Sequence, residues 1–322
     1  MATVTARLSG QSRNYWTGAD ALRLGEPWVV NQSGIGTSES VGVVVLNTRG
    51  RARCEQLLRR LVRPPLRGAG LVMLCETPWR TPRSSWSELA AELAARLEMS
   101  FVFVPEWAAA FGDGAARWFK GVALLSAEPF EDVRAIELPG FPFPRHPSYL
   151  TGAPHGLAAK VRLLGRPITV GVAHLNSRCA PEWRARQMER YLTLFSDGGP
   201  AIIGGDWNTT TTELGRGYGL LKVAGLMARR PARFRHPQPY EPLFEMLAQA
   251  GFETDRANRA GAPTFTFNGL VPRILRPHLD WIALRGLDAV PGSAKVVAAR
   301  NGPLARRFTD HDFVACEVAR PF

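Results

Sequence analysis

The sequence predicts an α/β protein in which two packed β-sheets are flanked by helices within one domain. Two observations favour this fold. Runs of residues typical of strands outnumber helical patterns, and several of these runs are apolar throughout, as expected for strands that are covered on both faces. In addition, the chain of 322 residues is 45% hydrophobic, which is enough to build a large core without disulfide or metal support.

The first half of the chain alternates between the two kinds of element. An apolar run at 41–47 is followed by a helical stretch with Leu57 and Leu61 on one face. A second apolar run covers 70–76, and a helix is expected from Ser85, which has capping-box spacing to Glu88. Further strands are predicted at 101–104, 121–126, 158–164 and 168–175.

The second half contains two predicted helices, at 181–195 and 242–250. Pro181 suits the first turn of a helix, because its missing N–H is not needed there. Strands are predicted at 201–206, 264–267, 279–284, 294–299 and 313–318. Residues 1–40 are polar and weakly periodic, so we expect an N-terminal extension there, followed by one folded domain over 41–322.

The composition indicates a reduced protein with anionic partners. The 40 basic and 28 acidic residues give a net charge of +12, which favours nucleic acid, phosphorylated metabolites or lipid head groups. Nearly all the positive charge is arginine, a usage that a GC-rich genome also produces. The four cysteines form no CxxC pair, which argues against a zinc knuckle or a disulfide framework. Without a recognisable signal peptide or membrane span, we expect a cytoplasmic protein without stable membrane association, monomeric by default.

Polar residues recur where predicted strands begin or end. Taken singly, each is better explained as a turn or capping residue. Together they predict an active site, because strand ends meet at the edge of a sheet, where side chains are both accessible and rigidly held. The residues at these positions are Asn47, Glu76, His174, Asp206, Asn208, Asp280, Asp310 and His311.

These residue types suit the hydrolysis of a phosphate ester. Oxygen ligands from Glu76, Asp310 and Asn47 favour Mg²⁺, which neutralises charge on a phosphoryl oxygen and on the leaving alkoxide. His311 is the candidate general base for the attacking water, provided that a carboxylate fixes its tautomer, and Asp280 is the candidate for that carboxylate.

Two further side chains are candidates for contacts with the phosphate. His174 and Asn208 are expected to donate hydrogen bonds to the non-bridging oxygens as charge moves onto them in the transition state.

Seven short motifs, in this order, resemble those of the endonuclease/exonuclease/phosphatase superfamily. They are VLN (45–47), LCE (74–76), GVALLS (121–126), AHLNS (173–177), GGDWN (204–208), HLDWIAL (278–284) and TDHD (309–312). The resemblance covers residues 41–318 and implies a four-layer αββα sandwich of two mixed sheets between helices. It also implies a metal-dependent hydrolase that uses Mg²⁺, with Mn²⁺ as a substitute.

The resemblance assigns a role to each polar residue. Glu76 corresponds to the principal metal ligand, with Asn47 beside it, and Asp310 to a further metal contact. Asp206 corresponds to the residue that orients or activates the nucleophile or protonates the leaving group. The remaining correspondences are a phosphate contact for Asn208, transition-state stabilisation for His174, and pairing of Asp280 with His311.

This chain departs from the family pattern at four places without losing a catalytic group. Cys75 stands where Gln is usual, Trp207 where Phe is usual, and Thr309 where Ser is usual. Asp312 and Phe313 follow the histidine, where a proline is common. An active enzyme is therefore expected, although these changes do not indicate one branch of the family.

The substrate is predicted from the basic segments. A loop between Glu213 and Tyr240 is rich in arginine, including Arg229, Arg230 and Arg233, and it has interleaved aromatics that suit backbone phosphates and stacked bases. A solvated arginine loop is the equal alternative. Arg117 and Lys120 extend the same basic rim before GVALLS.

We therefore favour a phosphodiesterase acting on DNA or RNA. A phosphatase or sphingomyelinase-like phospholipid phosphodiesterase of the same fold is the first alternative. A non-catalytic nucleic-acid-binding protein is the second, and the intact set of polar residues argues against it. No GxSxG motif of a serine hydrolase and no GxxxxGK phosphate-binding loop occurs in the sequence.

Overall fold

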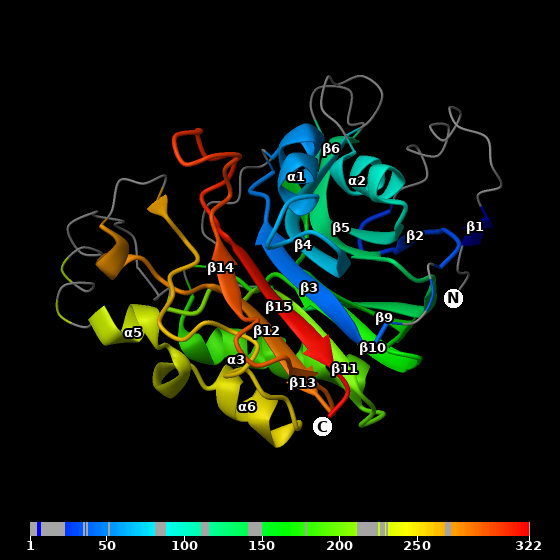
Figure 1. Ribbon diagram of the computed structural model, residues 1–322. Helices are drawn as coiled ribbons and strands as arrows, with labels where there is room; N and C mark the ends of the chain where they lie inside the picture. Colours follow the sequence, from blue (N-terminus) through cyan, green and yellow to red (C-terminus); the bar gives the residue numbers. More distant parts are fainter. Residues whose placement is uncertain are drawn as a thin grey trace.

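The structure, a computed structural model, consists of two mixed β-sheets packed face to face with helices on their outer sides (Figure 1). This arrangement confirms the predicted four-layer sandwich. The described residues are 5–7, 23–34, 36, 38–50, 52–80, 88–110, 116–140, 150–177, 179–210, 225, 229, 231–267 and 272–321.

The larger sheet has ten strands. Its main path runs in the order β1 (Thr5–Arg7), β2 (Trp28–Asn31), β5 (Ser100–Ala110), β6 (Ala116–Ser126), β4 (Ala69–Arg80), β3 (Ser40–Asn47), β15 (Phe313–Ala319) and β13 (Asp288–Ala289). Beside this path, β8 (Leu150–Gly152) pairs with β5, and β14 (Lys295–Val297) pairs with β15. The pairs β1–β2 and β3–β4 are parallel, and the others are antiparallel.

The smaller sheet has five strands. Their order is β12 (Asp280–Arg285), β11 (Ala201–Asp206), β10 (Arg166–Ala173), β9 (His155–Leu163) and β7 (Phe130–Glu137). Only the pair β10–β11 is parallel in this sheet. Parallel neighbours need a crossover, and the helix between β10 and β11 supplies it.

The larger sheet contributes side chains to two apolar layers, one on each of its faces. Successive side chains of a strand point to opposite faces, so Val43 and Val45 on β3 pack toward the smaller sheet. Val44 and Leu46, from the same strand, pack toward the outer helices instead. Burial on both faces explains why residues 41–46 of β3 have no polar side chain, rather than polar residues at alternate positions.

The helices form the two outer layers. The outer face of the larger sheet is covered by α1 (Cys54–Leu61) and α2 (Leu89–Leu97). The outer face of the smaller sheet is covered by α3 (Pro181–Leu192), the 3-10 turn η2 (Thr193–Phe195) and α6 (Leu243–Gln249). Short elements in the later loops are α5 (Pro231–Arg235), η3 (Gln238–Tyr240) and η5 (Arg273–Leu275). No helix in the described part of the chain is both long and apolar enough to cross a membrane.

The predicted strand at 264–267 is wrong. This segment forms one isolated bridge, between Phe265 and His311, instead of joining a sheet. Its polar groups serve the neighbouring loops, since the Thr264 hydroxyl accepts hydrogen bonds from the backbone N–H groups of Leu279 and Asp280. The alternation of threonine and phenylalanine therefore reflects a connection between two site loops rather than a strand.

The N-terminal region is partly ordered into the larger sheet. Within residues 1–40, which we expected to form an extension, β2 pairs antiparallel with β5. Val29 of β2 is buried in the core between the sheets, which gives this short segment a reason to join it. The predicted capping residue Ser85 lies outside the described residues, and α2 begins at Leu89 after Glu88.

Candidate active site

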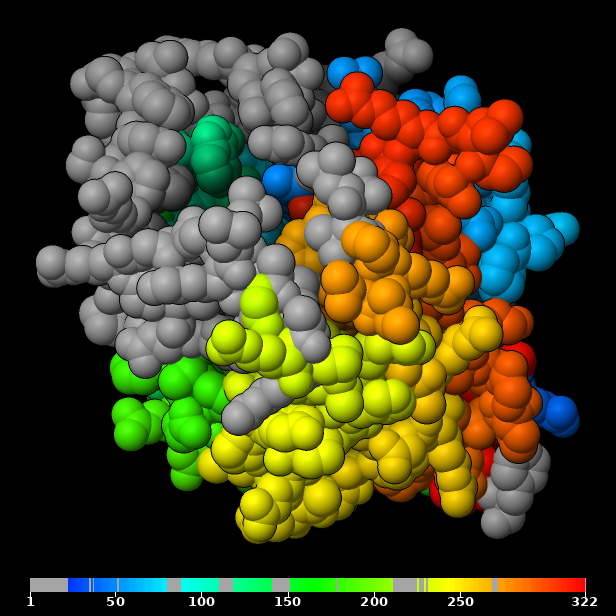
Figure 2. Space-filling view, turned by 90° about the vertical axis from the view of Figure 1, so that its left-hand side faces the viewer, coloured from blue at the N-terminus to red at the C-terminus, as the bar shows by residue number. Residues whose placement is uncertain are grey.

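The predicted polar residues meet where strands of the two sheets end. Asp206 at the end of β11 lies directly opposite Asp280 at the start of β12. Asn47, at the end of β3 in the other sheet, donates a hydrogen bond from Nδ2 to Asp206 Oδ2 at 2.8 Å. The site is therefore built between the two sheets. In Figure 1 the arrow of β3 points toward the left-hand side of the molecule, which is the side that faces the viewer in Figure 2.

His311 and Asp280 form a buried pair. His311 Nδ1 donates to Asp280 Oδ2 at 2.8 Å, and the ring of Phe265 packs edge-on against the imidazole with centroids 4.9 Å apart. This orientation turns the other ring nitrogen, Nε2, to within 3.7 Å of Asp206 Oδ2. Burial lowers the pKa of His311, but the charges of Asp280 and Asp206 oppose it and raise the pKa to about 10.

Asp206 is held by backbone and side-chain donors. The backbone N–H of Asn208 donates to Asp206 Oδ1 at 3.0 Å, and Asn208 adopts φ 49°, a left-handed conformation that asparagine tolerates well. Burial, followed by the nearby charge of Asp280, raises the pKa of Asp206 to about 7. The side-chain amide of Asn208 donates to the Leu175 carbonyl at 2.8 Å, so it also fastens the turn to the end of β10.

Glu76 projects from an irregular position in β4. The register between β4 and β6 shifts between Leu74 and Thr77, and Glu76 has φ 50°. Its Oε2 accepts from Lys120 Nζ at 3.1 Å, and its Oε1 lies 3.3 Å from Asn47 Nδ2. Burial raises the pKa of Glu76, but Lys120 and then other neighbours outweigh it and lower the pKa to about 2. The carboxylate is therefore ionised at neutral pH, with 23% of the side chain exposed.

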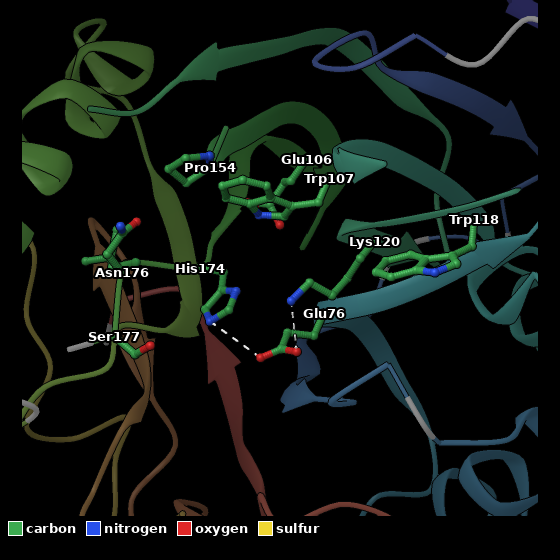
Figure 3. Close-up of a pocket in the computed structure, with 10 residues that line it drawn as sticks. Glu76, Glu106, Trp107, Trp118, Lys120, Pro154, His174, Asn176 and Ser177 are labelled. Carbon is green, nitrogen blue, oxygen red and sulfur yellow. Dashed lines mark hydrogen bonds and ion pairs between the residues drawn. The ribbon is translucent and has the colours of Figure 1, made fainter. Parts of the chain in front are cut away.

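His174 lies between the two carboxylates. Its Nε2 is 3.9 Å from Glu76 Oε1 and 3.7 Å from Asp206 Oδ2, and Figure 3 shows the ring facing Glu76. Burial lowers the pKa of His174 to about 4, so the ring is neutral at pH 7. A neutral imidazole in this place can donate one hydrogen bond to a phosphoryl oxygen.

The loop before β15 is held by contacts with Asn47 and Arg49. The Thr309 hydroxyl donates to the Asn47 carbonyl at 2.9 Å, and Asp310 Oδ2 pairs with Arg49 Nη1 at 2.6 Å. Asp312, to which the sequence assigned no role, forms an ion pair with Arg307 and accepts the Ala299 backbone N–H at 3.0 Å. The contacts of Asp312 thus stabilise the loop.

Two sets of residues could hold a divalent cation. The predicted set, Asn47, Glu76 and Asp310, supplies hard oxygen donors, and Asp310 Oδ1 is buried without a hydrogen-bond partner in the described structure. In the second set, ligand atoms of Asp206, Asp280 and His311 lie within 4.8 Å of one another. The Asp280–His311 hydrogen bond uses Asp280 Oδ2 and His311 Nδ1, and Asp280 Oδ1 is buried without a hydrogen-bond partner among the described residues.

Of the predicted substrate-binding residues, the structure brings Lys120 to the site through its contact with Glu76. Arg229 is exposed, and the guanidinium of Arg233 lies over the ring of Tyr240 at 5.9 Å. Arg230 and the side chain of Arg117 lie outside the described residues.

Sequence reasoning missed Arg49 and Glu106, both close to the site. Arg49 follows Asn47 by two positions and pairs with Asp310, whereas Glu106 directly follows the predicted strand 101–104 and the proline after it. The position of Glu106 after a strand was the same signal that identified Asn47 and Glu76. Glu106 lines a cavity of about 200 Å³ together with Glu76 and His174.

Solved structures with low sequence identity share the fold. An endonuclease/exonuclease/phosphatase from Beutenbergia cavernae matches with a TM-score of 0.61 and 17% identity over 88% of this chain and 72% of that chain. The human nocturnin catalytic domain with bound sulfate matches with a TM-score of 0.57 and 16% identity over 88% and 94% of the two chains. D. rerio TDP2 complexed with a single-strand DNA product has a TM-score of 0.51 and 16% identity over 87% and 99%.

Among curated proteins, no sequence matches the chain. The family model, by contrast, matches most of its length and includes nearly every residue of the site. This model describes the Endonuclease/Exonuclease/phosphatase family, and it matches residues 44–311, from β3 to His311. With the sandwich fold and the polar residues at its strand ends, this match shows that the chain belongs to the endonuclease/exonuclease/phosphatase family.

Proposed function

We propose that this protein is a Mg²⁺-dependent phosphodiesterase that hydrolyses phosphate esters in DNA or RNA. The observation that carries the proposal is the convergence of the His311–Asp280 pair and His174 on Asp206, with both histidine Nε2 atoms 3.7 Å from the same carboxylate oxygen. Such an arrangement can take up a proton and stabilise negative charge at one point, as phosphoryl transfer to water requires.

The attacking water gives up its proton to the pair formed by Asp206 and His311. Their facing atoms, Oδ2 and Nε2, lie 3.7 Å apart, close enough for the charge of one group to stabilise the opposite charge on the other while the proton is taken up. Asp280 keeps the His311 ring oriented and compensates its charge, which replaces the simpler picture of His311 as an isolated base.

The phosphate is held from the opposite side. Neutral His174 donates to a non-bridging oxygen, and Lys120, beside Glu76, adds positive charge where the phosphate accumulates negative charge. Glu76 and Asp310, with Asn47, would hold Mg²⁺, which when bound supplies charge neutralisation for the phosphoryl and leaving-group oxygens. Asn208 then acts chiefly through its backbone, which fixes Asp206.

Nucleic acid is the proposed substrate because the chain carries a net charge of +12. Long polyanions gain affinity from such charge through release of counterions, whereas small phosphate esters gain much less. TDP2, which shares this fold, was solved with a single-strand DNA product.

A side-by-side assay tests the proposal. Plasmid DNA, single-stranded RNA, sphingomyelin and inositol phosphates are incubated with the protein in Mg²⁺ and in chelator. We expect metal-dependent cleavage of one of the nucleic acids, and its loss in Asp206→Asn. Cleavage of only the lipid or inositol substrates would refute the nucleic-acid assignment, and turnover that persists in chelator would refute the metal assignment.

A further inference from the structure

The hairpin of β5 and β6 presents an aromatic face beside the catalytic residues. Trp107 pairs with Lys120, and Ala109 pairs with Trp118. Because cross-strand partners and alternate residues share a face, Trp107, Lys120 and Trp118 all point to the same side of the hairpin. All three line the cavity that also contains Glu76 and His174 (Figure 3).

Glu106 enters this cavity wall through a β-bulge. The register between β5 and β6 shifts between Pro105 and Trp107, so Glu106 has no partner of its own on β6. A bulge turns a side chain away from the regular alternation of the strand, and bulges are frequent next to active sites. Without it, Glu106 and Trp107 would point to opposite faces and could not both line one cavity.

The carboxyl group of Glu106 is incompletely satisfied. It is 0% exposed, and its Oε1 accepts the backbone N–H of His155 at 3.0 Å. Its Oε2 has no hydrogen-bond partner in the described part of the chain. Leaving a buried polar atom unpaired is unfavourable, so such an atom in a cavity wall is a position where a ligand group would gain a hydrogen-bond partner.

We propose that this cavity binds the nucleobase adjacent to the scissile phosphate, with the base stacked against the indole ring of Trp118 and hydrogen-bonded to Glu106. The proposal rests on the proposed function, because Glu76 and His174 form the adjoining wall of the cavity. Burial raises the pKa of Glu106 to about 8, so near neutral pH Oε2 can donate a proton to a ring nitrogen or carbonyl oxygen of a base.

Indole rings with a carboxyl group also suit a quaternary ammonium, such as a choline head group. Two observations favour the base. The ammonium of Lys120 lies in the same wall and offsets the negative charge of Glu76, with which it pairs, and a largely neutral Glu106 offers little charge to attract a cation. A planar, uncharged ring with hydrogen-bonding edges meets neither obstacle.

Equilibrium binding in chelator tests the subsite without hydrolysis. The four deoxynucleoside 5′-monophosphates are compared with deoxyribose 5-phosphate and phosphocholine. Stacking of one base is worth about 1–3 kcal/mol, so at least one nucleotide should bind about 5- to 150-fold more tightly than the base-free sugar phosphate. Trp118→Ala should remove most of this preference, whereas Trp183→Ala, the same change on α3, should preserve it.

Glu106 is tested by two substitutions with different hydrogen-bonding capacity. Glu106→Gln keeps an acceptor for His155 and a donor for the base, so nucleotide preference should survive. Glu106→Met removes both and should weaken binding of the preferred nucleotide about 10-fold. Circular dichroism and thermal unfolding identify any variant that fails to fold. If a Glu106 variant does not fold, the nucleotide preference of Trp118→Ala, a change at a half-buried position, tests the subsite instead.

The proposal is overturned if the wild-type protein binds nucleotides no better than deoxyribose 5-phosphate, or if Trp118→Ala keeps the full preference. Tighter binding of phosphocholine would assign the cavity to a lipid head group instead. Since the binding assay contains no turnover, nucleotide preference without nuclease activity would reject the proposed function alone. Nuclease activity without base preference would reject the subsite alone.

Discussion

Replacing Asp280 with asparagine tests the centre of the proposed mechanism. Asparagine matches aspartate in shape but has no charge, and its amide can present either oxygen or N–H to the ring of His311. The 2.8 Å contact between Asp280 Oδ2 and His311 Nδ1 therefore loses both its charge and its fixed direction. The ring can then adopt the tautomer in which Nδ1 is the acceptor, which leaves Nε2 with the proton.

The size of the effect follows from the pKa of His311. Burial lowers this pKa, but the neighbouring carboxylates outweigh burial, and Asp280 has the largest effect among them. The net result is a rise of the pKa from an ordinary 6.5 to about 10. The shift of 10 − 6.5 = 3.5 corresponds to about 5 kcal/mol in favour of the charged ring. Because the folded-state pKa is raised, this stabilisation is complete below pH 6.5 and is lost as the pH rises to about 10.

Asp280→Asn should remove most of that pH-dependent stabilisation, because burial disfavours the charged His311 ring and the main carboxylate that offsets this effect is gone. Urea unfolding of both proteins between pH 6 and pH 10 measures it as a difference between two curves, in which titrating groups far from Asp280 cancel. The pKa of Asp206, which the charge of Asp280 raises, also falls in the variant and contributes to the difference near pH 7. Two-dimensional NMR of the imidazole nitrogens should show the pKa of His311 falling toward or below its ordinary value. Turnover should fall about 10²- to 10⁴-fold.

Asp288→Asn is the matched control. Asp288 is a partly exposed carboxylate on β13 that forms a surface ion pair with Arg256 at 3.5 Å, so its loss should leave turnover and the His311 titration unchanged. Wild-type turnover in Asp280→Asn, or an unaltered His311 titration, would refute the assigned pairing.

Three further predictions concern the metal and the scaffold. Chelation should abolish activity and Mg²⁺ or Mn²⁺ should restore it, except in Glu76→Gln; a full response of that variant would exclude Glu76 as a ligand. Arg184 and Glu241 form a fully buried ion pair at 2.6 Å, so Arg184→Met should lower the free energy of unfolding, measured by urea titration, by about 3–5 kcal/mol. Adding Glu241→Leu should recover part of that loss, because it removes the unpaired buried charge. Gly205 has φ 145°, and an added Cβ would lie 2.0 Å from the Ala173 carbonyl oxygen, so Gly205→Ala should lower the free energy of unfolding by more than about 2 kcal/mol. Gly140→Ala is the control, because a Cβ there would meet no described atom within 4 Å, and equal unfolding curves for the two variants would contradict the prediction.

The sequence predicted the sheets well because their residues report burial directly. A run without polar side chains, such as residues 41–46 of β3, has to be covered on both sides, and that requirement already implies layers above and below. The prediction of a strand at 264–267 failed because alternation of polar and apolar residues also arises where threonine hydroxyls form hydrogen bonds with loops: Thr264 accepts from two backbone N–H groups, and Thr266 donates to the Asp310 carbonyl. Periodicity alone does not separate these two causes.

Site residues at strand ends were predictable as a set, but their pairings depend on long-range geometry. Asp312 and Asp310 stand two positions apart with the same side chain, yet one pairs with Arg307 and supports a loop while the other lies against Arg49. Only the folded arrangement decides which arginine is nearby. The same holds for Lys120 of β6, which was predicted to contact substrate and also pairs with Glu76 of the adjacent strand β4.

The motif GVALLS contains no catalytic side chain, and the structure gives a physical reason for its place beside the site. Irregularities occur on both strands that flank β6, one at Glu76 in β4 and one at Glu106 in β5, and both lie next to Gly121. A Cβ at Gly121 would lie 1.9 Å from the Val104 carbonyl oxygen, so only glycine lets β5 approach this closely where it bulges. The glycine thus allows two carboxyl groups, from the strands on either side of β6, to face one cavity, with Lys120 of β6 between them.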